Sequence, residues 1–374
     1  MNAFGDDVKS LRVAANLSLR ALARAAHIDP GYLSRIEAGT QTPSTDVARA
    51  LDRALGAAGR LIAAMQPRRR QERAPVLLGA DDVDAIRGTV ADLVARDTGH
   101  EGDRLHSTAV RTFRHFHDRL AAGHFRPGVA PDLQAALAEL GEVAGWLLFD
   151  ADKQPAARHM LTEAVLTAQL AGDRNMELFV TDLLAMQALH SGRPQEALLL
   201  ANRVMAAGGG PTRVAAMSLL RRGRALAELG SRQEALAALA CARGILSGGA
   251  TPSDPAWTWW VHEHEVMLHE ARARTALGDH AHAVDLSRRA VDGLPANQVR
   301  DQVIYRAWHL YDLVRAGAWA ESEALLEDLG PRLATAGSPR GVALVWQALD
   351  SADDDVPAAL VDAVRECVRH AERG

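Results

Sequence analysis

Three polar side chains, Tyr32, Ser34 and Arg35, are spaced so that they point outward from the first turns of one short helix. They lie in the stretch IDPGYLSRIEAG, in which Leu33 and Ile36 are spaced to face a core. Hydroxyl and guanidinium groups presented in this way can donate hydrogen bonds to base edges or phosphates in the major groove of DNA. The alternative is an ordinary helical hairpin whose outward residues contact only water.

The ends of this helix are marked by residue type. Asp29 is a candidate N-cap, and Pro30 suits the first helical position, where its missing N–H costs nothing. Gly31 removes side-chain bulk beside a partner, and Gly39 ends the helix. A preceding helix begins after another candidate cap, Ser18, and the short turn HID joins the two. Two helices joined like this, with the start of the second exposed, form a helix-turn-helix and predict binding to double-stranded DNA.

The segment from residue 6 to residue 65 resembles the lambda-repressor-like, or XRE-type, helix-turn-helix family. The resemblance rests on the stretches LRVAANLS, ALARAA, YLSRIEAGTQTPS and ARALDRALG. It implies a five-helix DNA-binding domain over residues 1–65, in which Arg12 on the first helix pairs with Glu37 at the end of the third.

Two residues depart from the pattern of that family. Leu19 stands where the second helix usually begins with Gln, and His27 stands where the turn usually has Gly. We therefore expect His27 either to adopt an unfavourable positive φ or to alter the turn. The expected DNA contacts are Ser18, Arg20, Pro30, Gly31, Tyr32, Ser34, Arg35, Thr40, Arg68 and Arg69.

A basic, Pro-bounded linker is predicted over residues 66–79. Its arginines, Arg68 and Arg69 among them, can follow DNA phosphates and add salt-dependent affinity, or the linker can be a solvated tether. Residues 1–75 hold twelve basic and seven acidic residues, a net charge of +5, so the rest of the chain carries −10. This asymmetry indicates a polyanionic partner for the N-terminal part alone.

The remainder of the chain contains an internal repeat. Five segments share a small residue, usually Gly or Asp, followed five positions later by a small residue inside a second helix. The spacing of the five anchors is 40, 38, 48 and 39 residues, and the anchors are Asp152, Gly192, Gly230, Gly278 and Gly317. The pattern resembles the tetratricopeptide repeat. It predicts an all-α chain in which a helical solenoid of stacked pairs covers residues 80–374.

A helix-turn-helix joined to a tetratricopeptide-like array resembles bacterial regulators of the quorum-sensing type and many actinobacterial regulators. The resemblance implies a homodimer whose array binds a small-molecule or peptide effector in its concave groove, which the first helix of each pair lines. Counting back six or ten residues from the anchors gives the candidate effector contacts Trp146, Asp182, Met186, Arg224, Arg272 and Tyr311. Aromatic and apolar side chains with two arginines suit an amphipathic ligand with an anionic group.

Two considerations weigh against parts of this interpretation. Any one of the six side chains can instead pack between helices. The C-terminal part has three Asn residues, and none lies at a counted position, which disfavours a linear peptide whose backbone is held by Asn.

A His-rich segment over residues 257–283 is a candidate metal site. His262, Glu265 and His269 lie on one helical face, and imidazole and carboxylate groups suit zinc. The stretch HEVMLH has one residue too many for the HExxH motif, and the alternative is solvated histidines at a helix end. We expect the tryptophans of this segment to cover an inserted loop or a partner subunit: Trp257, Trp259 and Trp260.

Several classes of protein are disfavoured. The chain has no P-loop, no GxSxG, no GxGxxG and no catalytic cysteine context, so we expect neither an enzyme nor a cofactor. Two distant cysteines and no long apolar run indicate a cytoplasmic protein without a membrane span. The sequence therefore predicts a DNA-binding transcriptional regulator that senses an effector. The alternative is a protein-interaction scaffold that a partner protein controls.

Overall fold

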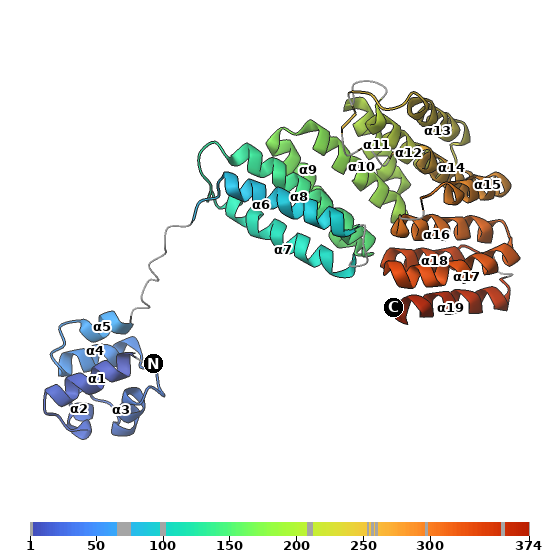
Figure 1. Cartoon of the computed structure of the whole chain (residues 1–374). Coiled ribbons are helices and arrows are strands. Elements are labelled where there is room, and N and C mark those ends of the chain that lie inside the picture. The colour runs from blue at the N-terminus through green and yellow to red at the C-terminus, as the bar shows by residue number, and fades with distance from the viewer. Residues whose placement is uncertain are drawn as a thin grey trace. The chain divides into compact units, whose positions relative to one another are not determined.

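The computed structural model divides the chain into two compact units, Met1–Val76 and Leu77–Gly374, which we call the smaller and the larger unit (Figure 1). Throughout the described part of the chain, the regular elements are α-helices, which confirms the predicted all-α class. The described residues are 3–65, 76–97, 102–207, 212–252, 254–255, 258, 261–295, 298–352 and 356–373.

The smaller unit is a bundle of five short helices around one apolar core. The helices are α1 (Ala3–Ala14), α2 (Leu19–Ala25), α3 (Pro30–Glu37), α4 (Thr45–Ala54) and α5 (Arg60–Met65). Leu33 and Ile36 of α3 are fully buried together with Val8, Leu22 and Leu51 from three other helices. The apolar spacing that predicted the orientation of α3 is therefore confirmed, and it fixes which face of α3 remains outside.

An ion pair joins α1 to α3. Arg12 donates to both carboxylate oxygens of Glu37, from Nε at 2.7 Å and from Nη2 at 2.8 Å, and its Nη1 donates to the carbonyl of Leu17 at 3.0 Å. The hydrogen bond to Glu37 is the main reason that the pKa of Arg12 is raised. This two-point contact fixes the angle of α3 as well as its position. The implied pairing is confirmed.

His27, in the turn between α2 and α3, has a strained backbone conformation. His27 has a φ of 54°, in the left-handed region that most residues avoid. The predicted unfavourable φ is thus confirmed. The turn keeps its hydrogen bonds, because the N–H of His27 donates to Arg24 and that of Ile28 donates to Ala23.

The larger unit is an array of helices that pack mainly against their neighbours in sequence. Figure 1 shows this succession from α6 to α19. The helices are α6 (Ala80–Asp97), α7 (Gly102–Ala121), α8 (Ala130–Asp150), α9 (Gln154–Ala171), α10 (Arg174–His190), α11 (Pro194–Ala207), α12 (Arg213–Glu228), α13 (Arg232–Ser247), α14 (Glu263–Ala276), α15 (His280–Asp292), α16 (Val299–Arg315), α17 (Trp319–Ala336), α18 (Pro339–Asp350) and α19 (Ala358–Arg373). Across the described residues, no helix is both long enough and apolar enough to cross a membrane.

The repeat anchors end the first helix of each pair. All five have a left-handed backbone, with φ between 54° for Asp152 and 80° for Gly230, as helix ends of this kind require. Five residues after each of the first four anchors stands a fully buried alanine: Ala157, Ala197, Ala235 and Ala283. The small side chains let the paired helices approach closely, as the repeat pattern predicts.

Two helical glycines allow paired helices of the array to approach closely. A Cβ added at Gly145 would lie 2.5 Å from Cδ2 of Leu161 across the α8–α9 pair, and one added at Gly223 would lie 2.7 Å from Cγ of Leu239 across the α12–α13 pair. Atoms in a close-packed interior cannot absorb such overlap without shifting. These pairs therefore depend on glycine for space.

Removing Arg12 should loosen the smaller unit. Arg12→Ala leaves the nearly buried carboxylate of Glu37 without its partner, which should cost roughly 2–4 kcal/mol of folding free energy. Hydrogen exchange of the α1 and α3 amides in the full chain would measure this as lost protection. The apolar pair Arg12→Met with Glu37→Leu should restore most of it. Unchanged protection in Arg12→Ala would show that the ion pair does not hold the two helices together.

Adding one methyl group at a glycine should have opposite effects at two sites. Gly145→Ala should lower the free energy of unfolding by roughly 1–3 kcal/mol through overpacking. Gly88 on α6 has no atom within 4 Å of an added Cβ, so Gly88→Ala should be neutral or stabilise by up to about 1 kcal/mol through helix propensity. Urea unfolding of both variants would compare them, and equal effects would contradict the close approach.

Candidate functional site

The first turn of α3 presents polar groups outward on a rigid base. Asp29 caps the helix, since its Oδ1 accepts the N–H of Tyr32 at 2.9 Å, and Pro30 occupies the first helical position. A Cβ at Gly31 would lie 3.0 Å from that capping oxygen, so glycine also keeps the cap free of crowding. Arg35 is exposed, with its guanidinium carbon 6.0 Å from the centre of the half-buried Tyr32 ring.

The other predicted contacts in the smaller unit are also exposed, and some have structural roles. The hydroxyl of Ser18 accepts the N–H of Ala21 at 3.1 Å as the N-cap of α2. The hydroxyl of Thr40 donates to the carbonyl of Arg35 at 3.1 Å, just beyond the end of α3. Arg20 is exposed on α2. The two remaining predicted contacts lie outside the described residues: Arg68 and Arg69.

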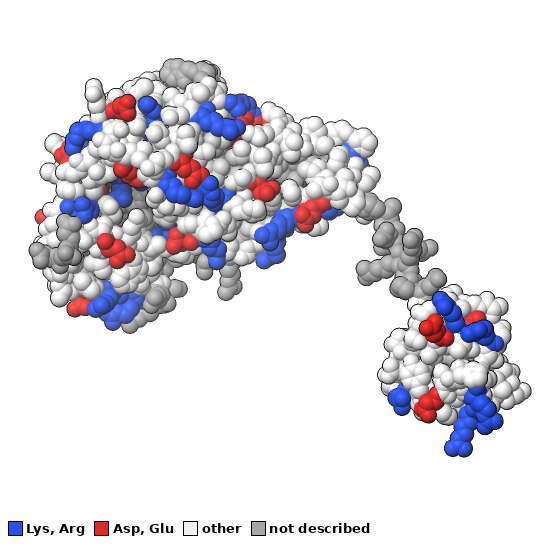
Figure 2. Space-filling model, turned by 180° about the vertical axis from the view of Figure 1, so that it is seen from behind, with Lys and Arg blue, Asp and Glu red and all other residues white. Residues whose placement is uncertain are grey.

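Positive charge on the smaller unit remains available to a partner. Figure 2 shows Lys and Arg side chains projecting from it. Within residues 3–65, neither Arg20 nor Arg35 forms an ion pair with an acidic residue. Exposed guanidinium groups without acidic partners are the groups that phosphates and guanine edges attract.

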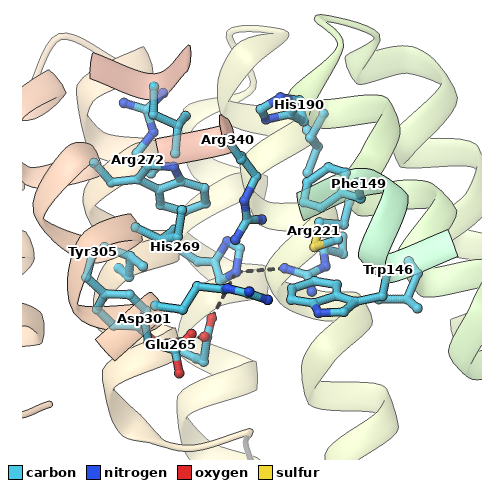
Figure 3. A pocket seen from close by; sticks show the side chains of 18 of the residues that line it. Trp146, Phe149, His190, Arg221, Glu265, His269, Arg272, Asp301, Tyr305 and Arg340 are labelled. Carbon is cyan, nitrogen blue, oxygen red and sulfur yellow. Dashed lines mark hydrogen bonds and ion pairs between the residues drawn. The ribbon is translucent and has the colours of Figure 1, made fainter. Parts of the chain in front are cut away.

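The larger unit encloses a cavity of about 950 Å³ on the side formed by the first helices of its pairs. Five of the six predicted effector contacts line it, one from each of the helices α8, α10, α12, α14 and α16: Trp146, Met186, Arg224, Arg272 and Tyr311. Figure 3 shows aromatic and charged side chains around this space. The volume lies within the range of small-molecule sites.

Asp182, the sixth predicted contact, does not line the cavity. It is fully buried, and its carboxylate accepts hydrogen bonds from Nε of Arg221 at 3.1 Å and from the hydroxyl of Ser218 at 3.2 Å. A residue ten positions before the anchor therefore turns its side chain toward the interface of α10 and α12. Asp182 acts by positioning Arg221. Nη1 of Arg221 also contacts Nε2 of His269 at 2.7 Å (Figure 3).

Two arginines in the cavity wall lack hydrogen bonds. Within the described residues, neither Arg224 nor Arg272 donates one, although ion pairs reach Glu228 at 3.7 Å and Asp312 at 3.6 Å. Arg224 is only 6% exposed, and its pKa is lowered to about 10, first by burial and then by repulsion from Arg272. Buried donors without acceptors are costly, so these guanidinium groups favour an anion.

Aromatic rings hold these two guanidinium groups in place. Trp308 lies under Arg224 at 4.8 Å and under Arg272 at 5.6 Å, and Tyr311 lies 3.6 Å from the guanidinium carbon of Arg272. Stacking on a ring stabilises the cation while its N–H groups stay available. Trp308 was not among the predicted contacts, because it lies nine residues before its anchor instead of six or ten.

An ion-pair clasp joins the two ends of the array. We define it as Asp97, Asp150, Arg300 and Arg340. The carboxylate of Asp150 lies 2.9 Å from Nη1 of Arg300 and 2.9 Å from Nη2 of Arg340, and Arg300 also pairs with Asp97. These contacts connect α6 and α8 to α16 and α18, and α18 packs directly on α8.

The clasp also borders the cavity. Asp97, Arg300 and Arg340 are lining residues, and the guanidinium carbon of Arg340 lies 5.4 Å from the centre of the Trp146 ring. The indole N–H of Trp146 donates to Oδ2 of Asp97 at 3.2 Å. A molecule that displaces Trp146 would therefore disturb the clasp directly.

Two of the candidate metal residues lie together, with Nε2 of His269 3.3 Å from Oε2 of Glu265, but His262 does not complete a metal site with them. Among the described residues, no group of three His, Cys, Asp or Glu side chains has the arrangement of a metal site. Nε2 of His269 is occupied by Arg221, and burial lowers the pKa of His269 to about 4, so the neutral ring accepts that hydrogen bond. His262 packs against His264 instead. The segment's tryptophans, Trp257, Trp259 and Trp260, lie outside the described residues.

Comparison with known proteins identifies the smaller unit. A family model described as a helix-turn-helix domain matches residues 3–65. The chain therefore carries an N-terminal helix-turn-helix domain, as the sequence predicts. A search of curated proteins gave no match.

Two solved structures show a weaker likeness over the whole chain. PlcR of Bacillus thuringiensis, in complex with the peptide PapR7 and DNA, is 15% identical with a TM-score of 0.37, covering 87% of this chain and 99% of that one. The apo competence regulator ComR from Streptococcus vestibularis is 16% identical with a TM-score of 0.35, covering 83% and 98%. TM-scores this low do not establish a common arrangement of the helices.

Neutralising the shared carboxylate of the clasp should destabilise the larger unit. Asp150→Asn leaves two nearly buried arginines with one acidic partner fewer, which should lower the free energy of unfolding by roughly 3–5 kcal/mol. Asp285→Asn is the control, because Asp285 pairs with Arg288 on the surface, where a pair contributes at most about 1 kcal/mol. Urea unfolding would compare them. Equal losses would show that the clasp contributes no more than a surface pair.

Proposed function

We propose that the chain is a sequence-specific, DNA-binding transcriptional regulator of the XRE type. The observation that carries this proposal is the exposed first turn of α3, which is held by its buried Leu33 and Ile36 and by the Arg12–Glu37 pair. In this proposal α3 enters the major groove, with Arg35 and Ser34 at base edges and Ser18, Arg20 and Thr40 at phosphates. The basic linker residues Arg68 and Arg69 add phosphate contacts.

The proposed regulator acts as a homodimer that an effector controls. Two helix-turn-helix domains would contact half-sites one helical turn, roughly 34 Å, apart. An effector that binds one arrangement of the array better than another changes the spacing of the two domains, and its differential affinity sets the response. We further propose a non-enzymatic protein of the cytoplasm, of the kind found in actinobacteria.

The proposed effector is an amphipathic molecule with an anionic group. Arg224 and Arg272 would bind the anion, because their buried N–H groups lack acceptors. Trp146, Met186 and Tyr311 would contact the apolar part. Asp182 contributes indirectly by positioning Arg221.

A second candidate function is a scaffold that a partner protein controls. It is supported by exposed leucines on two second helices of the array, Leu166 and Leu170 on α9 and Leu199 on α11, which are 51%, 72% and 72% exposed. Exposed apolar side chains that recur on one type of helix suit a protein surface. A stoichiometric partner in pull-downs from the native host would favour this function over a small effector.

Arg35→Ala tests the DNA-binding proposal. Operator sequences would first be selected from genomic fragments with the full chain. If Arg35 contacts guanine, the variant should lose roughly 1–3 kcal/mol of binding to them, measured by fluorescence anisotropy. Arg53→Ala on α4 is the control, since it removes an exposed arginine from the same unit without touching α3. Unaltered binding by Arg35→Ala would exclude the proposed base contact.

A further inference from the structure

The cavity wall contains basic and acidic groups without hydrogen bonds. Besides the arginines without hydrogen bonds, five acidic residues line it, and two of these are Glu142 on α8 and Asp301 on α16. Within the described residues, neither carboxyl group has a hydrogen bond or an ion pair.

Glu142 stands in an acidic part of the wall. Its pKa is raised to about 8, first by burial and then by repulsion from Asp97 and from Glu139 one turn earlier. The ring of Trp146, one turn later on α8, forms the adjoining surface and donates to Asp97. Carboxyl groups and an indole together favour an ammonium group. The ammonium group can donate hydrogen bonds to the carboxyl groups and make a cation–π contact with the indole ring.

The arginine part of the wall has the opposite character. Arg272 is the charged group that most affects the pKa of Arg224, followed by Glu228, Arg221 and Asp312, and neither Glu142 nor Asp301 is among these. No arginine is among the causes of the pKa shift of Glu142, whereas Arg340 and Arg300 lower the pKa of Asp301. A ligand with a single charge would form hydrogen bonds with one part of the wall and leave the other part without a partner in the ligand.

We propose that the ligand of this cavity is zwitterionic, with a protonated amine at Glu142, an anionic group at Arg224 and Arg272, and an apolar body against the rings of Trp146, Phe149 and Trp308. This inference rests on the proposed effector function and names the chemical class of the effector. A cavity of about 950 Å³ has room for a dipeptide or for an amino acid with a long aliphatic chain. Glu142 determines the specificity for the amine.

Both sources of this chemistry can be tested with matched probes. The dipeptide Phe-Phe has both charges, its N-acetylated form lacks the ammonium group, and its C-terminal amide lacks the carboxylate. In the aliphatic series, 8-aminooctanoic acid has both charges, octanoic acid has only the anion and octylamine has only the cation. Titrations of the full chain would follow tryptophan fluorescence, since Trp146 and Trp308 line the cavity.

The zwitterion of at least one series should bind roughly tenfold or more tightly than each of its single-charge forms, as a charge-assisted hydrogen bond allows. We call the loss of affinity of a single-charge probe relative to its zwitterion the penalty for the missing group. In Glu142→Gln, the penalty for the missing ammonium group should disappear, and the penalty for the missing carboxylate should remain. Arg272→Gln should do the reverse. Glu234→Gln on α13 is the control, because Glu234 is exposed and does not line the cavity, and this variant should keep both penalties.

The outcomes separate this inference from the function on which it rests. If the single-charge anions bind as tightly as the zwitterions, or if Glu142→Gln keeps the preference for the amine, the zwitterion proposal is overturned while an anionic effector stands. If neither zwitterion binds, the proposal is also overturned. If anionic probes bind equally well to Arg272→Gln, the proposed effector site itself is wrong. The DNA-binding proposal is tested separately by Arg35→Ala.

Discussion

The arrangement of the larger unit depends on one buried carboxylate. Asp150, at the end of α8, pairs with Arg300 and Arg340, which follow it by 150 and 190 residues and begin α16 and α18. A stack of helical pairs has no intrinsic reason to return on itself, because each pair contacts mainly its neighbours. The clasp supplies that reason. It places the last pairs against the first and leaves the charged cavity between them.

The clasp and the cavity share charged and aromatic side chains. Arg340 contacts Asp150 and lies over Trp146, while Trp146 donates to Asp97. Closure of the array and the shape of the site therefore share side chains. A ligand that binds Trp146 and the nearby Glu142 would act on the same contacts that hold the ends together, which gives a physical route from binding to a change of shape. The smaller unit needs no such device, since its five helices share one core.

Local features of the chain were predictable from the sequence, and distant pairings were not. Asp29, Pro30 and Gly39 mark the ends of α3 through their own backbone preferences, and the repeat anchors mark helix ends in the same way. Because a repeat fixes the rotation of each helix, counting from the anchors also placed five of six side chains at the cavity. Asp182 was misplaced because an offset of ten residues turns the side chain toward α12. Nothing in the sequence near Asp150 indicates its partners, since arginines are abundant and the pairing depends on the curvature of the whole array.

The most direct test of this account is the distance between the two ends of the array. Spin labels on cysteines introduced at Ala91 of α6 and Asp350 of α18, both exposed, would measure it in the full chain after Cys241→Ser removes the exposed native thiol. With the clasp intact, the distances should form one narrow distribution. With Asp97 and Asp150 both changed to Asn, the distribution should broaden and move to longer distances. An unchanged narrow distribution in that variant would contradict the claim that the clasp closes the array.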